Sequence, residues 1–157
     1  MNKITLFTLA LTISFLFSCK KEEITQVDDS DYLIFGHYFR DCEGESCIET
    51  FLITDGKLYE DLSDSYSRSV HFNFVELSNE KYKSTTDLLE TFPQKLLKDR
   101  RHSFGCPDCS GQGGLYIAYK KEGELKSWKL DPTKKNVPTY LHNFIDDVNT
   151  KLAQLNK

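Results

Sequence analysis

Between residues 32 and 130, apolar side chains alternate with polar ones over several short stretches, and this period of two predicts strands with one buried face. The sharpest break is Asp55-Gly56, a pair typical of a two-residue hairpin turn, in which both central residues need a positive φ. A second turn is expected at Glu122-Gly123-Glu124. We expect about six strands, most of them joined as hairpins, at residues 32–39, 48–54, 57–62, 70–74, 115–121 and 125–130.

Helical spacing replaces this alternation in two segments. From residue 78 the helical pattern is weak; the run Ser84-Thr85-Thr86-Asp87 is similar to a capping box, and Pro93 is expected to break the helix near Phe92. After Pro138, which suits the first position of a helix, apolar residues recur at intervals of four and three. These apolar residues are Leu141, Ile145, Val148, Leu152 and Leu155.

The opposite face of the C-terminal helix carries acidic residues, Asp146 and Asp147, rather than a basic belt. This favours packing on a sheet over lying on a membrane surface. On the same helix, Asp147 and Lys151 are four residues apart and are expected to pair. We therefore predict an α+β fold, with a mainly antiparallel sheet of about six strands and a C-terminal amphipathic helix packed on one face.

The N-terminal 18 residues form a separate segment with the layout of a secretory signal. Lys3 carries its only charge, and fourteen apolar or small residues follow, from Ile4 to Phe17. The run Leu16-Phe17-Ser18-Cys19 resembles the lipobox of bacterial lipoproteins, in which a Leu stands three residues before an obligatory Cys. The resemblance implies that a diacylglycerol is transferred to the Cys19 thiol, that the chain is cleaved before Cys19, and that the new amine is then acylated.

Residues 20–31 are polar and predict a flexible tether. Their first residues, Lys20-Lys21-Glu22-Glu23, resemble the charged export signals of Bacteroidota-type surface lipoproteins, although a solvated tether explains the same charges. We thus divide the chain into a signal peptide at 1–18, a lipidated Cys19 with its tether at 19–31, and a single domain at 32–157. The expected location is the outer membrane, where acylated Cys19 enters the lipid bilayer and the domain faces the periplasm or the cell surface.

Charge and composition narrow the classes of partner. The chain has 157 residues with 20 Lys and Arg against 24 Asp and Glu, so it lacks the basic surplus that neutralises phosphates, and nucleic acid is not expected to be a partner. Its hydrophobic fraction of 39% suffices for a core and argues against wholesale disorder. No apolar run of 18 or more residues follows the N-terminal segment, so we do not expect a membrane span there.

Four further cysteines form two close pairs, Cys42 with Cys47 and Cys106 with Cys109. An even number of cysteines in an exported chain favours disulfides. Cys42 and Cys47 flank a short turn between two predicted strands, which can bring their Cα atoms within the ~4.4–6.8 Å that a disulfide needs. We expect these local pairings; the alternative is a crossed pairing that ties the first hairpin to the central loop.

Two other roles for these cysteines stay open. The run Cys106-Pro107-Asp108-Cys109-Ser110-Gly111-Gln112-Gly113 resembles one copy of the zinc repeat of DnaJ-type chaperones, which implies a structural four-sulfur site completed by Cys42 and Cys47. Alternatively, Cys106 and Cys109 form a thiol–disulfide catalytic pair, but a predicted strand follows them instead of the helix that lowers the pKa of a thioredoxin-like thiol.

No acid, base, nucleophile and orienting group stand at a spacing that predicts a catalytic site, and the four histidines are scattered. We therefore predict a membrane-anchored extracytoplasmic lipoprotein that is a non-catalytic binding or interaction module, with no catalytic residues and no cofactor. An aromatic-lined pocket beside the Gly-rich segment 110–114 would locate its ligand site. The tyrosines that either line such a groove or belong to the core are Tyr32, Tyr38, Tyr59, Tyr66, Tyr116 and Tyr119.

Overall fold

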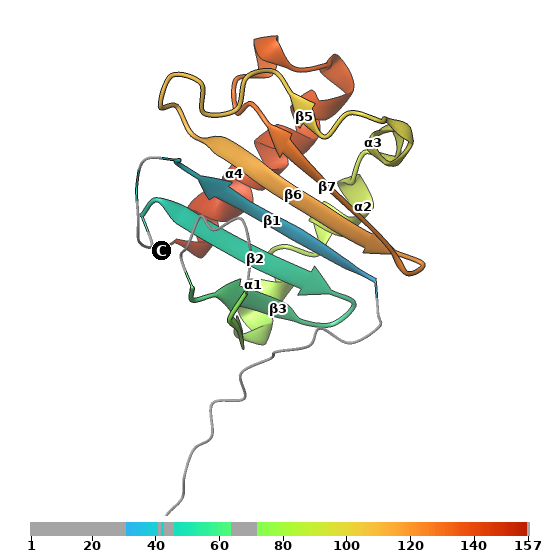
Figure 1. The fold of residues 1–157 in the computed structure, drawn as a ribbon. Helices are drawn as coiled ribbons and strands as arrows, with labels where there is room; N and C mark the ends of the chain where they lie inside the picture. The colour runs from blue at the N-terminus through green and yellow to red at the C-terminus, as the bar shows by residue number, and fades with distance from the viewer. Residues whose placement is uncertain (1–30, 41, 43–45, 64–71, 157) are drawn as a thin grey trace, which may run out of the picture.

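The computed structural model describes residues 31–40, 42, 46–63 and 72–156, and the predicted signal peptide, Cys19 and most of the tether lie outside them. The described strands form one seven-stranded sheet in the order β4-β3-β2-β1-β6-β7-β5, antiparallel at every pair except β5 with β7 (Figure 1). The strands are β1 (Tyr32–Tyr38), β2 (Ile48–Thr54), β3 (Leu58–Asp61), β4 (Phe74–Glu76), β5 (Ser103–Phe104), β6 (Gly114–Lys121) and β7 (Glu124–Leu130). The predicted α+β class is confirmed.

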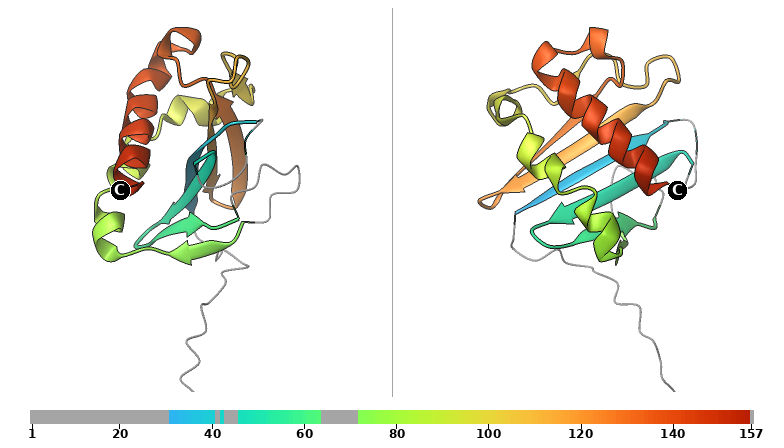
Figure 2. Two further views of the ribbon diagram at one scale, coloured as in Figure 1. Left: turned by 90° about the vertical axis from the view of Figure 1, so that its left-hand side faces the viewer. Right: turned by 180° about the vertical axis from the view of Figure 1, so that it is seen from behind.

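The helices are α1 (Asn79–Lys83), α2 (Asp87–Thr91), α3 (Gln94–Lys98) and α4 (His142–Leu155), with short 3-10 turns at Lys134–Asn136 and Thr139–Leu141. Figure 2 shows α4 crossing one face of the sheet, with α1 and α2 on the same side. The apolar residues predicted for the C-terminal helix are buried against that face, beside Phe144, which the spacing did not include. The helix covers the sheet as predicted.

The central strand β1 pairs along its whole length with β2 on one side and β6 on the other. Both hairpin turns form, but their backbones differ. At Glu122-Gly123 both residues have positive φ, of 52° and 82°, as a type I′ turn requires. At Asp55-Gly56 only Gly56 does, with φ of 113°, so the expectation of two positive φ angles is wrong there.

The helical segment between β4 and β5 departs from prediction at its caps. The expected capping box at residues 84–87 is wrong. The Thr85 hydroxyl turns back toward α1, where its Oγ1 donates to the Tyr82 carbonyl at 2.8 Å. Thr86 is the N-cap residue of α2, but its side chain makes no capping hydrogen bond. The break at Pro93 is confirmed, since α2 ends at Thr91 and α3 begins at Gln94.

The opposite face of the sheet has a second, smaller apolar cluster of Ile34, Leu52, Phe74 and Ala118. Half-buried aromatic rings surround it: Tyr32, Tyr59, Phe72 and Tyr116. Of the other candidate tyrosines, Tyr38 and Tyr119 are buried, at 3% and 8% exposure, and Tyr66 lies outside the described residues. The described candidate tyrosines therefore lie on both faces of the sheet and do not line a single groove.

Candidate functional site

Both predicted local disulfides are present, Cys42–Cys47 and Cys106–Cys109, each with its Cα atoms 5.5 Å apart. Each sulfur is thus bonded to another sulfur, and the thiolates that a four-sulfur zinc site needs are consumed. Strand β6 follows the second pair, as expected, so no helix begins at these sulfurs. Disulfides of this kind are typical of oxidising, extracytoplasmic compartments.

The loop that contains Cys106–Cys109 is tied to the end of β1 by one carboxylate. Asp108 is buried and has a positive φ of 56°. Its carboxylate accepts the backbone N–H of Arg40 at 2.6 Å and that of Gly113 at 3.0 Å, and its own N–H donates to the Gly113 carbonyl at 2.9 Å. Asp108 therefore joins the C-terminal end of the loop, at Gly113, to the residue that follows β1 by two positions, Arg40.

A second set of hydrogen bonds fixes the loop from within. The Gln112 carboxamide accepts the Ser110 N–H and donates to the Cys106 carbonyl, both at 2.8 Å. The Cys106 N–H donates to buried Asp131 at 3.1 Å. Burial opposes ionisation of Asp131, but hydrogen bonds, chiefly from Thr133, outweigh it and lower the pKa of the carboxyl. The loop is therefore held by hydrogen bonds along its length and forms a wall.

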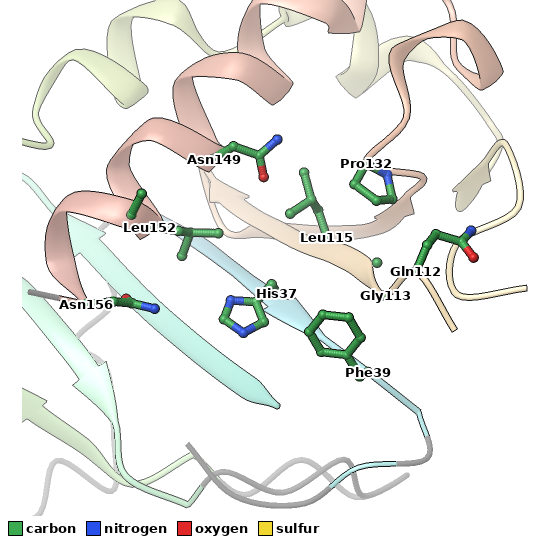
Figure 3. Close-up of a pocket in the computed structure, with 11 residues that line it drawn as sticks. His37, Phe39, Gln112, Gly113, Leu115, Pro132, Asn149, Leu152 and Asn156 are labelled. Atoms are coloured by element: carbon green, nitrogen blue, oxygen red, sulfur yellow. The ribbon is translucent and has the colours of Figure 1, made fainter. Parts of the chain in front are cut away.

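This wall forms one side of a pocket of about 320 Å³ at the end of β1, and the last turns of α4 form the other (Figure 3). His37 and Phe39 lie beside each other there, with ring centroids 5.8 Å apart and planes at 70°. Asn149 and Leu152 of α4 lie across from them. The complete lining is His37, Phe39, Gln112, Gly113, Gly114, Leu115, Pro132, Asn149, Leu152, Ala153 and Asn156.

A buried carboxylate supports the pocket from behind. Glu49 is the cross-strand partner of His37 and is 5% exposed. It accepts a hydrogen bond from the Asn156 carboxamide, and its Oε2 lies 3.9 Å from His37 Nδ1. Burial lowers the pKa of His37, partly offset by a backbone hydrogen bond at Ser46, and therefore favours the neutral imidazole.

A smaller hollow of about 200 Å³ adjoins the pocket across the Phe39 ring, which lines both. Its other lining residues are Arg40, Cys42, Asp108 and Gly111. Cys42 of one disulfide and Asp108, which stands between the two cysteines of the other, thus share one hollow. The four cysteines of the sequence prediction therefore lie at the same end of the sheet, next to the pocket.

Sequence reasoning located the Gly-rich wall of the pocket but missed His37, Glu49, Asn149 and Asn156. These residues come from β1, β2 and the end of α4, so no short motif contains them. The register of the β1–β2 hairpin could have indicated two of them, because the pairing of Tyr38 with Ile48 places His37 opposite Glu49. In the described segments no three His, Cys, Asp or Glu side chains are grouped to hold a metal ion.

Within the part of the chain that the structure describes, no helix has the length and apolar content needed to cross a bilayer. The chain matches no model of a known protein family, and no curated protein matches it significantly. What the pocket can bind therefore has to be inferred from the residues that line it.

Proposed function

We propose that this protein is an outer-membrane lipoprotein, anchored by acylated Cys19, whose domain binds a small ligand in the pocket without transforming it. The pocket carries this proposal: its volume of about 320 Å³ lies within the usual range of ligand sites, and hydrogen bonds hold the Gln112 and Asn156 carboxamides in place before any ligand arrives. The two disulfides agree with an extracytoplasmic domain.

The lining residues favour binding over catalysis. Among the described residues that line the pocket, His37 is the one side chain with an acid–base group, and no Ser, Thr, Cys or Lys is available there as a nucleophile. Glu49 orients His37 only loosely, at 3.9 Å, and is itself held by Asn156. Carboxamides can orient a ligand, but they neither accept nor release protons at neutral pH.

The pocket is tested by ¹H–¹⁵N NMR of the purified oxidised protein with a library of small polar fragments. We expect fragments to shift the amide signals of Gly113, Gly114 and Asn149 together. Asn149→Ala should weaken these fragments, whereas Asn143→Ala, an exposed position on the same helix outside the pocket, should not. Shifts that spread over the surface without selecting the pocket would contradict the proposal.

The anchor is tested separately by metabolic labelling with an alkyne analogue of palmitate. Cys19→Ser should abolish the label and release the protein from the membrane fraction, because one sulfur carries the diacylglycerol. Ser18→Ala keeps the cysteine and a small residue before it, and should leave labelling intact. Protease added to whole cells then distinguishes a surface-facing domain, which is cleaved, from a periplasmic one.

A second candidate function is thiol–disulfide exchange at Cys106–Cys109, because both cysteines of that pair are exposed. The reduction potential of the pair separates the two functions: structural disulfides lie below about −300 mV, and exchange catalysts well above. Metal analysis of protein made without reductant or chelator tests the zinc alternative, since one zinc per chain would require all four thiolates of Cys42, Cys47, Cys106 and Cys109.

A further inference from the structure

Phe39 supplies the one phenyl ring among the described residues that line the pocket, and close packing holds this ring in place. Gly113 packs so closely against the ring that a Cβ there would lie 2.7 Å from Phe39 Cε1. The His37 ring meets Phe39 edge to face on another side. A rigid aromatic face adsorbs the apolar C–H surface of a ligand at little cost in conformational entropy. Phe39 is therefore suited to hold one flat, apolar side of a ligand.

The remaining polar contacts come from three carboxamides, those of Gln112, Asn149 and Asn156. A carboxamide offers two N–H donors and an oxygen with two lone pairs. Gln112 uses one donor and one acceptor position within its own loop, which leaves one of each for a ligand. Asn149 is exposed, so its side chain can reach a ligand. Paired donors and acceptors of this kind match hydroxyl groups, which also donate and accept at once.

The electrostatics of the pocket favour an uncharged ligand. No Lys or Arg is among the described residues that line the pocket, and burial disfavours the charged form of His37, so an anionic group would find little counter-charge there. The carboxylate of Glu49 is buried behind the lining and bonded to Asn156, so it offers little to a cation.

An apolar face together with several hydroxyl groups and no charge is the chemistry of a neutral sugar. We infer that the pocket binds a neutral saccharide unit, with one face of the sugar ring on Phe39 and its hydroxyls bonded to Gln112, Asn149 and Asn156. This inference rests on the proposed ligand-binding function. The exposed rim residues Asn149, Ala153 and Asn156 leave room for the rest of an oligosaccharide to extend into solvent.

The test is a glycan array that carries neutral and acidic oligosaccharides, probed with the mature oxidised protein in detergent micelles. We expect binding to neutral glycans, and titration of the best of them should show a loss of about tenfold or more in affinity for Phe39→Ala and for Asn149→Ala. Asn143→Ala is the matched control and should bind normally. Phe39→Leu keeps an apolar side chain of similar bulk without the aromatic face, and it should also lose affinity while retaining the wild-type unfolding temperature.

Binding to acidic glycans alone would overturn the inference, as would neutral-glycan binding that survives both Phe39→Leu and Asn149→Ala. If no glycan on the array binds, while fragments that contain no sugar shift the NMR signals of Gly113 and Asn149, the saccharide class is refuted and the pocket remains a ligand site. If neither the glycan array nor the NMR fragment screen detects binding, the proposed function itself is refuted.

Discussion

The Asp108 carboxylate joins the Cys106–Cys109 loop to β1, and its removal is expected to destabilise the fold measurably. In Asp108→Ala the N–H groups of Arg40 and Gly113 lose acceptors at 2.6 and 3.0 Å. Arg40 is exposed and its N–H can turn to water, but Gly113 is buried and its N–H is left unpaired. An unpaired buried group costs about 1–3 kcal/mol, and alanine in a left-handed conformation adds about 1–2 kcal/mol. We expect a total loss of about 3 kcal/mol.

Two further substitutions at Asp108 separate these contributions. Asp108→Gly removes the carboxylate but accepts the φ of 56° without strain, so it should lose about 1 kcal/mol less than Asp108→Ala. Asp108→Asn tolerates the same φ and keeps one acceptor oxygen, so it should be the least destabilised, by about 1 kcal/mol. Urea unfolding of the oxidised proteins gives these values, with the fluorescence of Trp128, the single tryptophan and 1% exposed, as the probe.

The ranking is the critical result. If Asp108→Gly is as unstable as Asp108→Ala, the backbone conformation at Asp108 contributes nothing. If Asp108→Ala unfolds within about 0.5 kcal/mol of the wild type, the carboxylate does not clamp the loop. Amide exchange at Gly113 provides an independent measure, because it should accelerate in Asp108→Ala and stay nearly unchanged in Asp108→Asn.

Three further predictions address the disulfide, the sheet and the pH response. The double variant Cys106→Ser, Cys109→Ser should lower the free energy of unfolding by about 2 kcal/mol and accelerate amide exchange at Gly113. The matching double variant at Cys42 and Cys47 should leave the exchange at Gly113 unchanged. Equal acceleration in both variants would refute a local effect of the Cys106–Cys109 disulfide. Gly36→Ala places a Cβ against the backbone of β2 and should cost about 1–3 kcal/mol in urea unfolding, so a neutral result would mean that the strands separate easily. Burial lowers the pKa of His37 below 6.5, so the unfolded chain binds the proton more readily and stability should fall as the pH drops below about 6.5. His37→Gln should weaken that fall between pH 7.5 and 5.5, and an unchanged slope would show that other groups cause it.

Strands with a long alternating pattern could be predicted from the sequence, and those that depend on tertiary contacts could not. The ranges of β1, β2, β6 and β7 differ from expectation by one residue or less. β5 has two residues, too few to alternate, and it exists because the Lys129 and Asp131 N–H groups donate to the His102 and Phe104 carbonyls. The predicted strand 70–74 is described only in part, and β4 runs from Phe74 to Glu76.

The ion pairs of α4 also depend on tertiary contacts that the sequence pattern does not describe. Spacing predicts that Lys151 pairs with Asp147, but Lys151 instead meets Asp87 of α2 at 2.8 Å. Pairs within a helix contribute only a few tenths of a kcal/mol, so a neighbouring helix with a suitable carboxylate readily replaces them. The packing of α2 against α4, which the sequence pattern does not describe, decides the outcome.

In the candidate site, too, local features could be predicted from the sequence and features that depend on tertiary contacts could not. The disulfides are local, five and three residues apart in the chain, and cysteine spacing predicted them. The pocket needs β1, the 106–114 loop and the end of α4 together. His37 and Asn156 are 119 positions apart in the chain, so no motif search brings them together. The two kinds of feature are nevertheless linked, because Asp108 and Gln112 lie within or next to the Cys106–Cys109 ring and also shape the pocket wall. A short disulfide ring stabilises little through chain entropy, about 2 kcal/mol, but this ring leads directly into the Gly-rich loop whose Gly113 packs closely against Phe39, and it limits the conformations of that loop. A ligand that binds this wall therefore does not have to order the loop itself.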